Sequence, residues 1–251
     1  MRKFRKHFLF FKDKNAEENK VSSDEKAKKG IKSSKKNNVT ELVFIIDKSG
    51  SMQGLEKDTI GGFNAMIEKQ KKEEGEAYVT TVFFNTHFDV VHDRVELSKV
   101  EPLTEQQYRV GGCTALLDAI GWSIGHISSI HRYARPKDVP AKTIFLITTD
   151  GMENASQRYL SHQIKMMIKA KEECGWEFIF VAANIDAVET AESIGIRSER
   201  AASYKQNAEG TDRLYCAMSE AVASYRRNDT INNDWRSLLD EFEDKDDNNK
   251  K

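Results

Sequence analysis

The sequence predicts an α/β fold in which helices cover both faces of a mostly parallel β-sheet. Short apolar runs rich in β-branched residues recur along the chain, as in strands that are buried on both faces. Segments with a helical spacing of apolar residues fill the gaps between them. This alternation favours a three-layer α/β/α fold with a sheet of about six strands, one of them an antiparallel edge strand. The 251 residues are enough for a substantial core.

The expected strands share an apolar interior and polar ends. The first is the run Leu-Val-Phe-Ile-Ile, which ends directly at Asp47. The third is expected to pair beside the second through the short connection 85–87, and the sixth is the weakest. The expected strands span residues 42–46, 78–84, 88–91, 143–148, 178–181 and 202–204.

The expected helices carry apolar stripes at intervals of three and four residues. The first contains Gly61 and Gly62, a pair that costs helix stability but would let its backbone approach a neighbour closely. Ser156 is a candidate N-cap of the third helix and Thr211 of the fifth. The stripes lie within residues 55–67, 116–130, 160–168, 187–194 and 214–225.

Charge divides the chain into three parts. Charged residues make up 31% of the chain, against about 25% in an ordinary domain, and the excess lies at the ends. Residues 1–39 are interpreted as a basic, disordered tail, because they have too little apolar content to offset the entropy of ordering. Residues 40–227 form the expected domain. Residues 228–251 form an acidic tail, in which Trp235, Leu238, Leu239 and Phe242 could make one short docking helix.

The basic tail leaves several interpretations open. Its first 12 residues place Phe4, Phe8 and Phe11 at helical spacing among basic residues, so weak contact with a membrane surface is an alternative to a solvated tail. Partner binding and nucleic-acid contact by the tail also stay open, but no specific nucleic-acid binding is expected. No apolar run approaches the length of a membrane span, and no secretory signal is recognisable.

The cysteines indicate a reducing compartment. The chain has three cysteines, an odd number, and they lie far apart at Cys113, Cys174 and Cys216. This favours a cytoplasmic chain without a thiolate metal site. Peripheral attachment to the membrane remains an alternative localisation. Cys174 and Cys216 fall in helical stretches and are expected to be small buried hydrophobes.

Three polar loops are expected to meet at one edge of the sheet. The first strand is followed by Asp47-Lys48-Ser49-Gly50-Ser51, and the fourth by Thr149-Asp150-Gly151. The loop that precedes the second helix contains Gly111-Gly112-Cys113-Thr114. Ligands of α/β proteins bind outside the carboxyl ends of the strands.

The candidate ligands in these loops are all oxygen donors. Two carboxylates and three hydroxyls favour Mg²⁺, with Mn²⁺ or Ca²⁺ as alternatives, over Zn²⁺ or Cu²⁺. Because few of these ligands are charged, a bound ion would stay electrophilic and would favour a carboxylate supplied from outside. The candidate metal residues are Asp47, Ser49, Ser51, Thr114 and Asp150.

This pattern closely resembles the metal-ion-dependent adhesion site (MIDAS) of von Willebrand factor type A (VWA) domains. The resemblance covers roughly residues 40–227, and residues 150–156 also look like bacterial members, including those associated with tellurium resistance. It implies a Rossmann-like fold and a protein-interaction module rather than an enzyme. Cys113 is a departure, since Gly or Ser often precedes the motif threonine; it leaves the ligand set complete but puts a thiol near the metal.

The resemblance also implies roles for the five residues. Ser49 and Ser51 would bind the metal directly, and Thr114 directly or through water. Asp47 and Asp150 would act mainly through bound waters. The sixth position would be open to an acidic side chain of a protein partner.

Structural interpretations compete at several residues. Asp47 could instead cap a helix. Asp118 and Glu153, near the motif in sequence, are expected to lie on a helix face or to support the ligands. In each of the histidine pairs His87/His92 and His126/His131, the two residues are five positions apart. This spacing does not place two side chains on one helix face, so no ligand role is expected.

An enzymatic alternative stays open. A Mg²⁺-dependent phosphohydrolase could use Asp47 as its nucleophile, since acidic residues and a metal at strand ends perform this chemistry. Haloacid-dehalogenase-like phosphatases have Asp-x-Asp-x-Thr at this place. In this sequence Ser49 replaces the second aspartate, which is the expected general acid.

Overall fold

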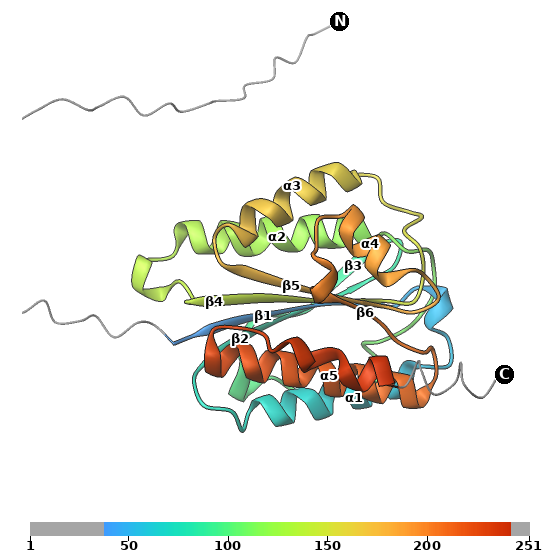
Figure 1. Ribbon diagram of the computed structural model, residues 1–251, viewed down its shortest axis with the longest axis horizontal. Coiled ribbons are helices and arrows are strands. Elements are labelled where there is room, and N and C mark those ends of the chain that lie inside the picture. Colours follow the sequence, from blue (N-terminus) through green and yellow to red (C-terminus); the bar gives the residue numbers. More distant parts are fainter. Residues whose placement is uncertain (1–37, 242–251) are drawn as a thin grey trace, which may run out of the picture. The chain divides into compact units, whose positions relative to one another are not determined.

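The computed structural model describes residues 38–241, which form a three-layer α/β/α fold. Within these residues a six-stranded sheet has the order β3-β2-β1-β4-β5-β6, with helices on both faces (Figure 1). The β2–β3 pair is antiparallel and the other pairs are parallel. This confirms the predicted fold class. The strands are β1 Thr40–Asp47, β2 Ala77–Phe84, β3 Phe88–Glu96, β4 Lys142–Thr149, β5 Trp176–Ala182 and β6 Ala201–Ser203. The α-helices are α1 Glu56–Gln70, α2 Leu116–Tyr133, α3 Ser161–Glu172, α4 Ala187–Ser193 and α5 Ala208–Asn228.

The central strand β1 shows why its sequence is apolar throughout. Leu42, Phe44 and Ile46 face the core cluster on the side of α1 and α5. Val43 and Ile45 face the cluster on the side of α2, α3 and α4. Figure 1 shows these two helical layers on opposite faces of the sheet. A strand between two such layers buries both of its faces, so polar alternation is lost.

The glycine pair of α1 allows a close helix contact. A Cβ atom on Gly62 would lie 2.3 Å from Cδ2 of Tyr215 in α5, whereas a Cβ atom on Gly61 would meet nothing within 4 Å. The expected close approach therefore belongs to Gly62, where the Tyr215 ring lies against the α1 backbone.

Several expected details were wrong. Ser156 does not cap the third helix, because α3 begins at Ser161 and Ser156 lies in the preceding loop, hydrogen-bonded to Asp118 and Glu153. The N-cap of α5 is Asn207, whose side chain accepts from the Gly210 amide at 2.8 Å, and Thr211 lies inside the helix. Strand β3 continues well beyond its expected end at residue 91.

Residues 231–241, beyond α5, pack against the domain. The 3-10 helix Asn233–Arg236 is followed by helical residues 237–241. Ile231, Trp235 and Leu239 lie in the core cluster that also holds α5. Trp235 Nε1 donates to the Glu199 carbonyl at 3.1 Å, and an Arg236 nitrogen donates to the Ala201 carbonyl of β6 at 2.9 Å.

Some expectations concern residues outside the described range. The proposed membrane-contacting segment 1–12, the remainder of the basic tail and Phe242 all lie there. Among residues 38–241, no helix combines the length and apolar character that a membrane crossing requires.

Candidate metal centre

Neighbouring parallel strands carry the two candidate aspartates to one edge of the sheet. Strands β1 and β4 pair in register, with Ile46 opposite Thr148. Asp47 is the last residue of β1, and Asp150 directly follows the last residue of β4. The carboxyl ends of both strands therefore place these carboxylates at the same edge.

Backbone hydrogen bonds join the remaining loops to this edge. The Gly50 amide donates to the Gly112 carbonyl at 3.0 Å, and the Gly111 amide donates to the Lys48 carbonyl at 2.9 Å. Gly112 has a φ of +81°, and a Cβ atom there would lie 2.8 Å from Oγ1 of Thr86. Both the left-handed backbone and the crowding require glycine at this position.

A chain of hydrogen bonds connects four of the candidate ligands. Asp47 accepts through Oδ1 from the Ser49 amide at 2.7 Å. Its Oδ2 accepts from Oγ1 of Thr149 at 2.6 Å. Oγ of Ser49 lies 3.0 Å from Oγ of Ser51, which donates to Oδ1 of Asp150 at 2.6 Å. The motif residues of β1 and β4 thus form one connected polar network.

Thr114, the fifth candidate ligand, reaches the same place from the start of α2. Its amide donates to the Asn154 side chain at 2.9 Å, and its carbonyl accepts from the Asn154 amide at 3.0 Å. A Cβ atom built on Gly151 would lie 3.5 Å from Oγ of Ser51 and 3.8 Å from Oγ1 of Thr114. The two hydroxyls therefore both lie near the position that a side chain on Gly151 would take.

The donor chemistry suits a hard divalent cation. Two carboxylates and three hydroxyls converge here, and Asp47, Ser49, Thr114 and Asp150 are buried. Within residues 38–241 there is no cluster of three or more His, Cys, Asp or Glu side chains that could hold a metal. Oxygen donors of this kind match Mg²⁺, Mn²⁺ or Ca²⁺.

Burial raises the pKa of both aspartates. For Asp47 the loss of water is the largest cause, opposed by the hydrogen bonds from Thr149 and Ser49, and the charge of Asp150 raises the pKa further. For Asp150 the loss of water is again the largest cause, and the Ser51 hydroxyl opposes it. A bound cation would favour the charged form of both groups.

Several residues at the site were not expected. Tyr108 donates its hydroxyl to the Asp47 carbonyl at 2.5 Å, and Thr149 and Asn154 hold motif residues as described above. Gln206, in the loop between β6 and α5, donates to Oδ2 of Asp150 at 2.6 Å. Thr149 and Asn154 lie within or beside the motif stretch 149–156, whereas Tyr108 and Gln206 come from segments far apart in the sequence that no short motif marks.

The other candidates near the motif have structural roles. Asp118 accepts from the backbone amides of residues 157–159 at 2.9 to 3.0 Å. Glu153 accepts from the amides of Leu117, Ala155 and Ser156 at 2.7 to 2.9 Å. Together they hold the loop after β4 against the start of α2.

Within residues 38–241, the rings of His92, His126 and His131 bond to groups other than the candidate ligands. His92 contacts Thr81 and His126 contacts Asp93, each through a ring nitrogen. Cys113 is exposed beside Thr114. The expectation of buried cysteines was wrong, because Cys174 lies exposed in the turn after α3 and Cys216 is half-buried.

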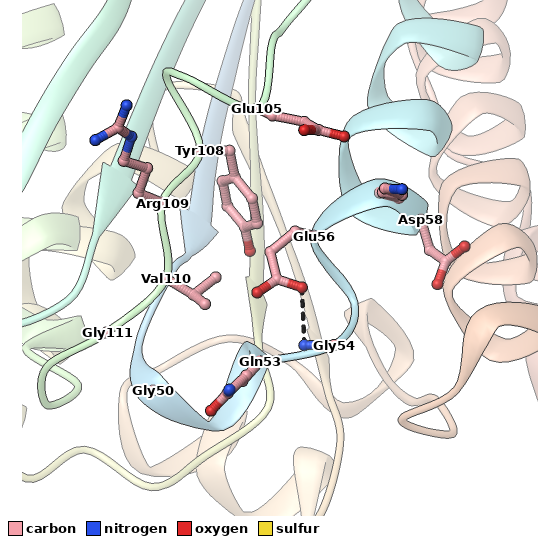
Figure 2. A pocket seen from close by; sticks show the side chains of 11 residues that line it. Gly50, Gln53, Gly54, Glu56, Asp58, Glu105, Tyr108, Arg109, Val110 and Gly111 are labelled. Atoms are coloured by element: carbon pink, nitrogen blue, oxygen red, sulfur yellow. Dashed lines mark hydrogen bonds between the residues drawn. The ribbon is translucent and has the colours of Figure 1, made fainter.

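A pocket of about 800 Å³ lies beside the metal loops, which are the loops after β1 and before α2 that carry Ser49, Ser51 and Thr114. The pocket shares Gly50 and Gly111 with these loops. Figure 2 shows Glu56 at its centre, with its carboxylate accepting from the Gly54 amide at 2.8 Å. The Tyr108 ring lines the pocket, which carries both acidic and basic side chains at its rim. The pocket therefore offers space for chemical groups next to any external ligand that binds at the candidate metal centre.

No family model matches the sequence, and no curated protein matches it. Proximal thread matrix protein 1 from the mussel byssus is similar in structure, with 12% identity and a TM-score of 0.50 over 74% of this chain and 46% of that chain. Another structure of that protein, described with a zinc-occupied MIDAS motif, has the same identity and TM-score over 73% of this chain and 46% of that one. A von Willebrand factor type A structure from Catenulispora acidiphila has 12% identity and a TM-score of 0.49, over 74% of this chain and 42% of that chain. This chain thus spans less than half the length of these proteins, and at such identities the likeness to the mussel protein shows the fold alone.

Proposed function

We propose that this chain is a metal-dependent protein-interaction module with a MIDAS-type site. Asp47, Ser49, Ser51, Thr114 and Asp150 would hold a divalent cation, and the cation would bind an acidic side chain of a partner protein. The observation that carries the proposal is the clustering of the motif oxygens. Ser49, Ser51 and Asp150 form one chain of contacts, and the hydroxyls of Ser51 and Thr114 both lie near the position that a side chain on Gly151 would take.

The hydrogen bonds support a division of roles among the five residues. Both oxygens of Asp47 already accept hydrogen bonds from the protein, which suits a residue that acts on the ion mainly through water. Asp150 is expected to act in the same way. Ser49 and Ser51 would bind the ion directly, and Thr114 directly or through water.

Mg²⁺ is the proposed ion, with Mn²⁺ or Ca²⁺ as alternatives. Three neutral hydroxyls leave much of the charge of a divalent ion uncompensated, so an external carboxylate is a suitable additional ligand. The structure described with zinc for the mussel protein makes Zn²⁺ a necessary comparison in any titration.

A protein partner fits the surroundings of the site. Met152, next to Gly151, has 72% of its surface exposed and offers an apolar contact beside the metal loops. The neighbouring pocket can receive residues that flank the partner's carboxylate. The partner and the process are to be found by experiment.

The phosphohydrolase alternative gains no support from the geometry. A nucleophilic Asp47 needs an accessible oxygen, but the residue is 0% exposed and both of its oxygens are held by Ser49 and Thr149. We therefore propose a binding function and no catalytic one.

Affinity capture and calorimetry test the proposal. The full chain should bind Mg²⁺ in a titration, and it should capture partner proteins with Mg²⁺ but not with a chelator. Asp47→Ala and Ser49→Ala should lose both properties and stay folded by circular dichroism. Ser98→Ala is the matched control, because Ser98 is exposed at the opposite edge of the sheet. Partner capture that survives in Asp47→Ala would contradict the proposal.

A further inference from the structure

Two loops outside the motif also reach the candidate metal centre. Gln206, between β6 and α5, donates from Nε2 to Oδ2 of Asp150 at 2.6 Å and to the Ser51 carbonyl at 2.7 Å. Its Oε1 accepts from Nδ2 of Asn184, between β5 and α4, at 2.7 Å. The same Asn184 nitrogen lies 3.3 Å from the Asp150 carbonyl oxygen. One uncharged side chain thus connects the two loops that follow β1 and β4.

This contact fixes the orientation of Asp150. Its Oδ1 accepts from the Ser51 hydroxyl and its Oδ2 accepts from Gln206, so neither oxygen is free to turn. Ser51 is held at two points, through its hydroxyl by Asp150 and through its carbonyl by Gln206. Hydrogen bonds of this kind orient the groups that surround a metal and tune its properties.

The segment that carries Gln206 is itself firmly placed. Asn207, the next residue, caps α5 by accepting from the Gly210 amide at 2.8 Å. A Cβ atom on Gly210 would lie only 2.0 Å from the Lys205 carbonyl oxygen, so residues 205–207 pack closely on the first turn of the helix. Asn184 has a φ of +57°, a left-handed conformation that asparagine tolerates better than most residues. Helix α5 and the turn after β5 therefore fix the two amides at the metal centre.

We propose that Gln206 is a positioning residue of the metal site, which orients Asp150 without adding charge. A carboxylate at this position would have no hydrogen to donate to Asp150 or to the Ser51 carbonyl, and it would supply the ion with an additional negative charge. The neutral amide leaves the ion with more of its own charge, as binding of an external carboxylate requires. This inference rests on the proposed function, because it assumes that the site binds a divalent cation.

Titration of the full chain with Mg²⁺ alone tests the inference through two variants. Gln206→Ala removes the hydrogen bonds to Asp150 and Ser51, so its affinity for Mg²⁺ should fall by about tenfold. Gln206→Glu removes the same donors but adds a negative charge near the ion, so its affinity should rise by roughly tenfold. A purely structural role predicts that both variants weaken binding.

Thermal unfolding adds a second readout. In a chelator, Gln206→Glu should unfold at a lower temperature than the wild type, because its added carboxylate would repel Asp150. Mg²⁺ should raise its melting temperature by more than that of the wild type. Gln157→Glu adds the same charge to an exposed loop residue that does not contact Asp150, and it should bind Mg²⁺ within about twofold of the wild type because of ionic screening.

The outcomes separate this inference from the proposed function. If the wild type binds Mg²⁺ and Asp47→Ala does not, but both Gln206 variants match the wild type or weaken binding equally, only the role of Gln206 is overturned. If the wild type binds no divalent cation, the proposed function fails and the inference fails with it. Opposite changes in Gln206→Ala and Gln206→Glu would support both.

Discussion

Gly151 lies beside the hydroxyls of Ser51 and Thr114, two of the candidate ligands. An added Cβ atom would lie 3.5 Å from the first hydroxyl and 3.8 Å from the second, which are ordinary contact distances. A methyl group there would be tolerated by the protein alone, but it would occupy the space proposed for the cation. A substitution at this position should therefore test the proposed metal binding without disturbing the fold.

Gly151→Ala should abolish or sharply weaken Mg²⁺ binding and leave stability nearly unchanged. In a chelator, its free energy of unfolding should stay within about 0.5 kcal/mol of the wild type, as for substitutions without steric conflict. Urea denaturation with and without Mg²⁺ measures both effects. Gly125→Ala in α2 is the control for Mg²⁺ binding, because an added Cβ atom there meets nothing within 4 Å. Its free energy of unfolding should rise by about 0.5–1 kcal/mol through helix propensity alone. A Gly151→Ala variant with wild-type Mg²⁺ affinity would show that the cation lies elsewhere.

Individual residues differ in how far the sequence could predict them. Four of the five candidate ligands follow apolar runs directly, and Thr114 lies in the Gly-Gly loop before the second expected helix. Local pattern was therefore enough to single them out, and their metal-binding roles stay predictions. Gln206 and Asn184 approach the site from two other strand ends. Their contacts depend on the order of β4, β5 and β6 in the sheet, which no local pattern contains.

At the scale of elements, the contact between α1 and α5 depends on one glycine. Gly62→Ala would place a Cβ atom 2.3 Å from Cδ2 of Tyr215, so one of the two helices must move. Overpacking of this kind costs about 1–3 kcal/mol, and the gain in helix propensity offsets about 1 kcal/mol of it. We expect Gly62→Ala to lower the free energy of unfolding by up to about 2 kcal/mol.

Gly61→Ala is the matched control in the same helix. Gly61 is exposed and an added Cβ atom meets nothing within 4 Å, so helix propensity alone should act. This variant should raise the free energy of unfolding by about 0.5–1 kcal/mol. Urea denaturation of both variants gives the comparison, and equal stabilisation by the two would mean that Tyr215 does not restrict α1.

The elements themselves were predicted better than their ends. Apolar runs located the strands because a strand between two helical layers buries every side chain, as β1 does. The ends depend on tertiary contacts instead. Ser156 has the chemistry of an N-cap, but its hydroxyl bonds Asp118 and Glu153, and that loop crosses the start of α2 before α3 begins.

At the scale of the whole molecule, the sheet order explains where the candidate site lies. Strands β1, β4, β5 and β6 are parallel neighbours, so the loops after all four open at one edge. Each of these loops supplies a residue to the polar network around Asp150. A fold of this kind can place groups from distant segments together, and the site follows from the topology as much as from the motif.

The segment after α5 is an integral part of this molecule as far as residue 241. The expected domain ended at Arg227 on the basis of charge, because the acidic side chains that follow dominate the composition. In the structure Ile231, Trp235 and Leu239 are buried among the acidic residues, at a spacing of four. Net charge averages over such sparse apolar residues, whereas the spacing of Trp235 and Leu239 already indicated a short docking helix.

Trp235→Ala should therefore destabilise the whole domain. The side chain is 3% exposed, packs in the core cluster with α5 and donates to the Glu199 carbonyl at 3.1 Å. Truncating a buried tryptophan costs about 3–5 kcal/mol, which corresponds to a fall in melting temperature of roughly 6–20 °C for a domain of this size. Leu238→Ala is the control, because that side chain is 39% exposed and should cost less than about 1 kcal/mol. Thermal unfolding of both variants tests this prediction. We expect a single transition whose midpoint shifts in Trp235→Ala alone. Equal small shifts in both variants would show that the segment is not part of the cooperative fold.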